Sequence, residues 1–118
     1  MPEPESRLPV HAEVGALIRA VSAVGGFATV IAKGERDAGT LMIVCCGKDR
    51  LAAAYERMPQ RDGQRVWAVA CQQTTEKPEQ FWEYCDRRKK QDPDLWIVEL
   101  DVPDGERFVD SLGTRVDG

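Results

Sequence analysis

The sequence has little histidine and lacks the usual metal and phosphate motifs. His11 is the only histidine, and the four cysteines, at positions 45, 46, 71 and 85, contain no CxxC pair. Structural zinc sites usually combine closely spaced cysteine and histidine ligands. Phosphate-binding loops follow GxGxxG or GxxxxGK[ST], and neither pattern occurs. We therefore expect no metal, no cofactor, and cysteines that stay reduced in the cytoplasm.

The chain also lacks a long apolar run and an excess of positive charge. Its 118 residues carry a net charge of −4, which disfavours nucleic acid and anionic lipid as partners, although a local basic patch could still bind phosphate. No stretch approaches the roughly 20 apolar residues of a membrane span, and the first residues, MPEPESR, are acidic, unlike a signal peptide. We expect a protein partner or self-association, and no membrane contact.

Periodic apolar residues predict two helices. From about Val10 to Val24 they recur every three or four positions, and Gly25-Gly26 provides a helix end. A second helix is predicted from Pro78 to Lys90, because proline suits a first helical turn.

Five short segments rich in β-branched and apolar residues predict strands. They are residues 27–33, 41–46, 51–58 and 66–71 and the segment DPDLWIVEL, with Asp62-Gly63 and Asp104-Gly105 as hairpin turns, the latter leading into a short strand over 107–109. The order α-β-β-β-β-α-β predicts an α+β fold. We expect a largely antiparallel sheet of four to six strands, the first four forming a meander, with both helices packed on one face. Residues 9–112 would form the single domain, with loose ends at 1–8 and 113–118.

The stretch KGERDAG, residues 33–39, offers a pair of carboxylates. Glu35 and Asp37 could divide acid and base roles or share a divalent cation. They also lie in a six-residue link closed by Ala38-Gly39, where an acidic side chain can cap a turn. We favour the turn.

A second acidic pair lies on the last predicted strand. Glu99 and Asp101 are two residues apart, so their side chains project from the same face. With Asp92, Asp94 and Asp104 close by in sequence, they could form an acidic cluster that holds magnesium or manganese, or mark the solvated end of an edge strand. We favour the second interpretation.

Four consecutive cations end the second predicted helix. Arg87, Arg88, Lys89 and Lys90, with Trp96 nearby in sequence, could form a binding surface. Cations at this end also complement the helix dipole, and that structural role is the one we favour.

The chain resembles the bacterial domain-of-unknown-function family 1491. The resemblance covers about Leu8 to Gly105, and its most recognisable parts are Lys33-Gly34, Asp37-Ala38-Gly39 and Asp92-Pro93-Asp94-Leu95-Trp96. Glu35-Arg36 stands where the family pattern would have an Asp-Pro-like pair. The resemblance implies a short, single-domain, cytoplasmic protein of alphaproteobacteria, and implies no activity, cofactor or catalytic residue.

Two functions follow as hypotheses. The first is a non-enzymatic protein-binding or adaptor module that presents a sheet edge or the second helix. The second is a divalent-metal-dependent phosphodiesterase or nuclease-like enzyme. The second requires the four carboxylates Glu35, Asp37, Glu99 and Asp101 to converge in space.

Overall fold

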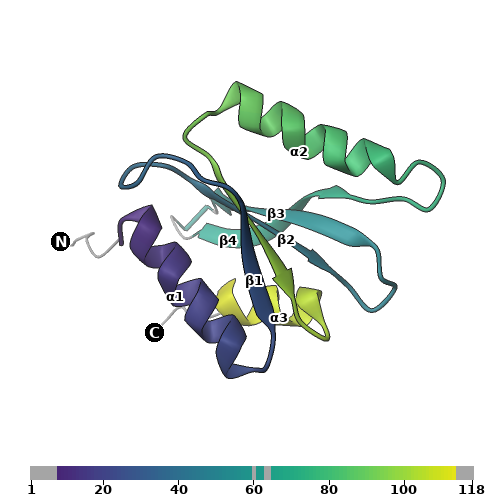
Figure 1. Cartoon of the computed structure of the whole chain (residues 1–118), viewed down its shortest axis with the longest axis horizontal. Helices are drawn as coiled ribbons and strands as arrows, with labels where there is room; N and C mark the ends of the chain where they lie inside the picture. The colour runs from purple at the N-terminus through teal and green to yellow at the C-terminus, as the bar shows by residue number, and fades with distance from the viewer. Residues whose placement is uncertain (1–7, 60, 63–64, 114–118) are drawn as a thin grey trace.

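The computed structural model describes residues 8–59, 61–62 and 65–113. Eight elements follow one another along the chain (Figure 1). They are α1 (Val10–Ala23), β1 (Phe27–Ala32), β2 (Leu41–Cys46), β3 (Ala52–Pro59), β4 (Arg65–Gln72), α2 (Glu79–Gln91), β5 (Trp96–Asp101) and α3 (Gly105–Gly113). The α+β class is confirmed, and the expected helices and strands up to β5 lie within a few residues of their predicted positions.

The sheet has five strands in the order β1-β5-β2-β3-β4. β2, β3 and β4 pair antiparallel in sequence, as a meander requires. β5, however, lies between β1 and β2, antiparallel to β1 and parallel to β2. The predicted four-strand meander is therefore corrected to three strands, with the last strand inserted at the centre.

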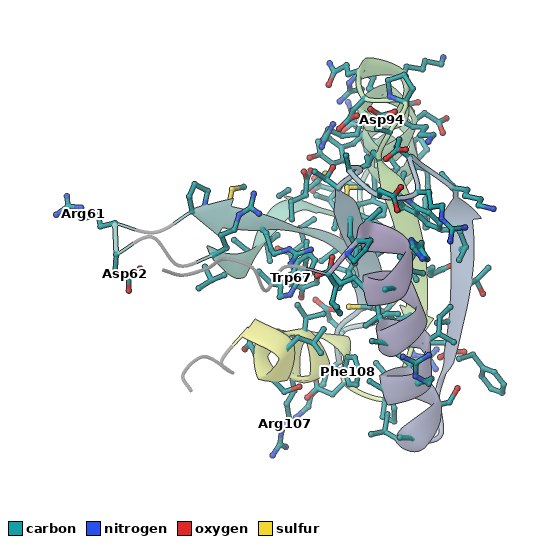
Figure 2. The ribbon with its side chains drawn as sticks, turned by 90° about the vertical axis from the view of Figure 1, so that its left-hand side faces the viewer. Arg61, Asp62, Trp67, Asp94, Arg107 and Phe108 are labelled. Atoms are coloured by element: carbon teal, nitrogen blue, oxygen red, sulfur yellow. The ribbon has the colours of Figure 1, made fainter. Side chains whose placement is uncertain are left out.

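Helices cover both faces of this sheet. α1 and α3 lie on one face and α2 on the other (Figure 1). The α1/α3 core contains Val14, Val21, Ile43, Val98 and Val109, and Figure 2 shows Phe108 of α3 on the side toward α1. The α2 core contains Phe81 and Cys85 packed on residues of β2, β3 and β5. The expectation that both helices share one face is corrected accordingly.

Burial on both faces explains the composition of the central strands. β2, with the sequence LMIVCC, is buried at every position but its last. β5 is buried at Trp96, Ile97, Val98 and Leu100. A strand covered on both faces has no solvent side and so shows an apolar run in place of alternation.

Local chemistry fixes the ends of α1. Gly25 has φ +83°, a left-handed conformation that costs glycine little. The Gly25 N–H donates to the Ser22 carbonyl (3.0 Å) and the Gly26 N–H to the Val21 carbonyl (2.9 Å). This pattern is a Schellman motif. The predicted end of the first helix is confirmed.

The segment after β5 differs from its prediction. Asp104-Gly105 is no hairpin, because Gly105 begins α3, and residues 107–109 are helical. The Asp104 carboxylate accepts a hydrogen bond from the Arg107 N–H (3.3 Å), and the Asp104 backbone carbonyl accepts one from the Phe108 N–H (3.1 Å). This is the arrangement at a capped helix start.

Some expectations fall on residues outside the described part of the chain. Gly63 of the predicted turn is one, although β3 and β4 do pair antiparallel on either side of it. The loose ends 1–8 and 113–118 lie almost wholly outside, so that assignment stays a prediction. Within the described residues, no helix is long and apolar enough to cross a membrane.

Candidate functional site

Glu35 caps a turn. Its Oε1 accepts hydrogen bonds from the N–H groups of Asp37 (2.8 Å) and Ala38 (2.5 Å). These bonds, chiefly the one from Ala38, lower the pKa of Glu35 below its usual value. The carboxylate therefore stays ionised and orders the 33–40 link, as the turn interpretation expects.

The 33–40 link is held against the start of β5. The Glu35 N–H donates to the Asp94 carbonyl (3.1 Å), and the Trp96 Nε1–H donates to the Glu35 carbonyl (2.8 Å). A Cβ at Gly34 or Gly39 would overlap the Asp94 carbonyl oxygen. The glycines of KGERDAG are thus required by the close approach of two backbones.

Lys89 completes this junction from α2. Its ammonium donates to the carbonyls of Lys33 (2.9 Å), Pro93 (2.7 Å) and Leu95 (2.9 Å). The parts of the sequence that carry the family resemblance therefore meet at one place. They are Lys33-Gly34, Asp37-Ala38-Gly39 and residues 92–96. Their contacts are mainly to backbone atoms, which indicates a role in holding the fold.

The rest of the predicted basic surface is partly used in the same way. Arg88 forms a bidentate ion pair with Glu56 (2.7 and 3.0 Å), which also accepts a hydrogen bond from the Tyr84 hydroxyl. Trp96 is only 5% exposed. Of the proposed surface residues, Arg87 and Lys90 are exposed to solvent.

Glu99 and Asp101 lie away from the Glu35 turn. They face the α2 side of the sheet near its other end, opposite Thr29 and Phe27 of β1. At about 3.3 Å per strand residue, they lie roughly 10 and 16 Å beyond Trp96, which contacts the turn. The four carboxylates do not converge. In residues 8–59, 61–62 and 65–113, no group of three or more His, Cys, Asp or Glu side chains could hold a metal ion.

The free cysteines are not activated in the structure. Burial raises the pKa of Cys45 to about 12 and that of Cys85 to about 11, and also raises the pKa values of Cys46 and Cys71. A thiol must ionise to act as a nucleophile, so these residues have little thiolate near neutral pH.

Strand β1 is an open edge with exposed apolar side chains. Phe27 is 72% exposed, Ile31 46% and Val30 39%. The strand, with the sequence FATVIA, contains no charge, and a register shift between Val30 and Ala32 interrupts its pairing with β5. An uncharged apolar edge is a template for adding another strand, and a bulge is one way to limit that addition.

A shallow hollow of about 300 Å³ lies beside this edge. It is lined by Phe27 and Thr29 of β1, Cys46 of β2, and Glu99 and Asp101 of β5, among others. The edge and the hollow together present a backbone, an aromatic ring and two carboxylates on one face. The sequence predicted this strand, as residues 27–33, but did not single it out as a binding edge, although the run FATVIA without a charged residue was the available signal.

The fold and these loops define a small α+β protein with a mixed sheet between helices. The chain belongs to the DUF1491 family, described as a protein of unknown function, whose model matches residues 8–110. The alphaproteobacterial resemblance of the sequence is thereby confirmed. No curated protein matches the chain.

Solved structures of the family have the same fold. The chain is 32% identical to a DUF1491 family protein from Caulobacter crescentus CB15, whose crystal structure superposes with a TM-score of 0.75 over 86% of this chain and 94% of that one. An NMR structure of a DUF1491 family protein from the same organism superposes with a TM-score of 0.70 at 32% identity, over 86% of this chain and 92% of that one. The solution structure of protein Atu0922 from A. tumefaciens superposes with a TM-score of 0.70 at 29% identity, over 95% of this chain and 97% of that one.

Proposed function

We propose that this protein is a non-enzymatic binding module that captures an extended segment of a partner protein along the edge of β1. The observation that carries the proposal is that β1 combines an open edge, no charge and three exposed apolar side chains. Strand addition would satisfy the outward backbone groups of β1 and cover these side chains.

The neighbouring charges indicate the chemistry of the partner segment. Glu99 and Asp101 are next to β1 on the face that carries Phe27, and Cys46 of β2, which lines the same hollow, has a raised pKa and stays neutral. A lysine or arginine of the added strand could reach one of these carboxylates while an apolar neighbour contacts Phe27. The bound segment would therefore contain both apolar and basic residues. Its regular pairing would end at the bulge after Val30.

We also propose that the protein acts in the cytoplasm. All four cysteines are free, which is the usual state of thiols in a reducing compartment.

Selection of displayed random peptides against the intact protein tests this function. We expect enrichment of peptides that contain lysine or arginine together with apolar residues. Amide hydrogen exchange with a selected peptide should show new protection in β1. The variant Glu99→Gln/Asp101→Asn should bind such a peptide about threefold to tenfold more weakly, since exposed ion pairs contribute about 0.2 to 1 kcal/mol each.

The matched control is Glu79→Gln/Glu83→Gln, which makes the same change in charge on α2. It should bind the peptide as the original protein does. Equal loss in both double variants, protection outside β1, or the absence of any selected peptide would reject the proposal.

A further inference from the structure

A second site lies at the other side of the sheet, where α3 begins. A cavity of about 450 Å³ opens there. Its walls come from the turn between β2 and β3, from β3 and β4, and from the first residues of α3, with Leu51, Ala53 and Val69 as apolar lining. The cavity is separate from the β1 edge, and its function is independent of the one proposed above.

Tyr55 on β3 is a largely buried residue that lines this cavity. The residue is 5% exposed, and its ring belongs to the α1/α3 core. No residue in the described part of the chain forms a hydrogen bond with its hydroxyl. A buried polar group without a partner is costly, so native structures almost always satisfy such groups.

The Tyr55 hydroxyl stays protonated at physiological pH. Burial, and then the nearby Cys45, Glu106, Asp110 and Asp104, raises the pKa of Tyr55 to about 12. A neutral phenol oxygen can accept a hydrogen bond from a ligand, and the acids Asp49, Asp104 and Glu106 line the same cavity.

The charged lining of the cavity is predominantly negative. Asp49, Asp104 and Glu106 oppose a single cation, Lys48. Two of the acids serve the backbone: Asp49 accepts from the Leu51 N–H (3.0 Å), and Asp104 from the Arg107 N–H (3.3 Å). Glu106 forms no ion pair or hydrogen bond with any described residue. One carboxylate and one hydroxyl therefore remain for a ligand.

We propose that this cavity binds a small organic cation, an alkylammonium or alkylguanidinium group. The nitrogen donates to the Tyr55 oxygen and pairs with the Glu106 carboxylate, while the alkyl chain lies against Leu51 and Val69. An anion would meet three carboxylates, and a neutral alcohol would leave Glu106 without a counter-charge.

Titration of the intact ¹⁵N-labelled protein with agmatine and with butylamine tests the site. We expect saturable shifts at the amides of Gly47, Leu51 and Glu106. 1-Butanol and butyrate, which have similar apolar bodies without the cation, should give no saturable shifts. Tyr55→Phe and Glu106→Gln should each weaken agmatine binding by about threefold to tenfold, the loss of one hydrogen bond or ion pair.

Glu83→Gln on α2 is the control for the change in charge, and it should leave the agmatine affinity unchanged. Thermal unfolding of the free protein gives a second readout. Because the hydroxyl has no internal partner, Tyr55→Phe should not lower the melting temperature. Absence of saturation at millimolar agmatine, equal binding of butyrate or 1-butanol, unchanged affinity in both site variants, or clear destabilisation by Tyr55→Phe would each overturn the proposal.

Discussion

At the scale of single residues, several charged side chains hold the fold through hydrogen bonds and ion pairs inside the protein, and only some remain at the surface. Lys89 and Arg88 are neighbours in a basic run, yet each is committed to contacts inside the protein. The sequence indicated their place at the end of a helix, and the dipole argument predicted a structural role. It could not indicate which carbonyls Lys89 would reach, because Lys33 is 56 residues away along the chain.

Substitution of Lys89 tests this structural role. Lys89→Met should lower the free energy of unfolding by about 2 to 3 kcal/mol, because three carbonyls lose a charged donor. Lys90→Met, on an exposed neighbour, should change it by less than about 0.5 kcal/mol. Urea unfolding measures both, and equal effects would contradict the assignment. Lys89→Arg should not restore stability, since a planar guanidinium does not match three converging acceptors.

The Glu56–Arg88 pair predicts a pH dependence. The hydrogen bond from Arg88 lowers the pKa of Glu56 below its usual 4.5. A carboxylate whose pKa is lower in the folded state stabilises the protein at pH values above its unfolded-state pKa. That contribution is lost as the pH falls through the folded-state pKa. Glu56→Gln should thus cost about 1 to 2 kcal/mol at neutral pH.

The penalty of Glu56→Gln should shrink as the pH is lowered below 4.5. Urea unfolding of both proteins across the acid range measures this difference. A penalty that stays constant down to the lowest pH would show that the charge of Glu56 is not its source.

At the scale of elements, replacing two glycines with alanine should change the stability of the protein in opposite directions. Gly34→Ala should destabilise by about 3 kcal/mol, because the new methyl group overlaps the Asp94 backbone. Gly15→Ala should stabilise by about 0.5 to 1 kcal/mol, because it lies within α1 and the nearest atom is Arg19 Nη1 at 3.5 Å. Thermal unfolding compares them, and a neutral Gly34→Ala would contradict the close approach.

Strand positions were predictable from sequence, and strand order was not. Local composition and turn residues marked β2 and β4 nearly to the residue. The insertion of β5 between β1 and β2 depends on pairing across the whole chain, which no local pattern encodes. The unbroken apolar runs LMIVCC and LWIV did carry an unused signal, since strands without a polar side need helices on both faces.

The error over α3 has a local cause. The strand over 107–109 was predicted because Asp104-Gly105 is a common hairpin-turn dipeptide. Helical spacing was also present, because Phe108, Val109 and Leu112 lie on one side of a helix that Asp104 caps. The cavity beside α3 could not be predicted either, because nothing in the sequence distinguishes Tyr55, one of its lining residues, from any other aromatic residue in a strand.

At the scale of the whole molecule, the order β1-β5-β2-β3-β4 predicts how stability is distributed. Amides of β2 and β5, paired on both sides and covered on both faces, should exchange only through global unfolding. Amides of β1 and β4 should exchange faster through partial opening of an edge. Native-state hydrogen exchange in low denaturant measures this order. Slower exchange in β1 than in β2 would contradict it, unless a bound segment covers the edge.

The central position of β5 also has a consequence for synthesis of the chain. A ribosome delivers β1 and β2 well before the strand that must lie between them, so in a nascent chain β1 has no native neighbour and β2 can pair only with β3. Only when residues 96–101 leave the exit tunnel can the sheet close. Until then, the exposed apolar surface of the unpaired strand favours self-association of nascent chains.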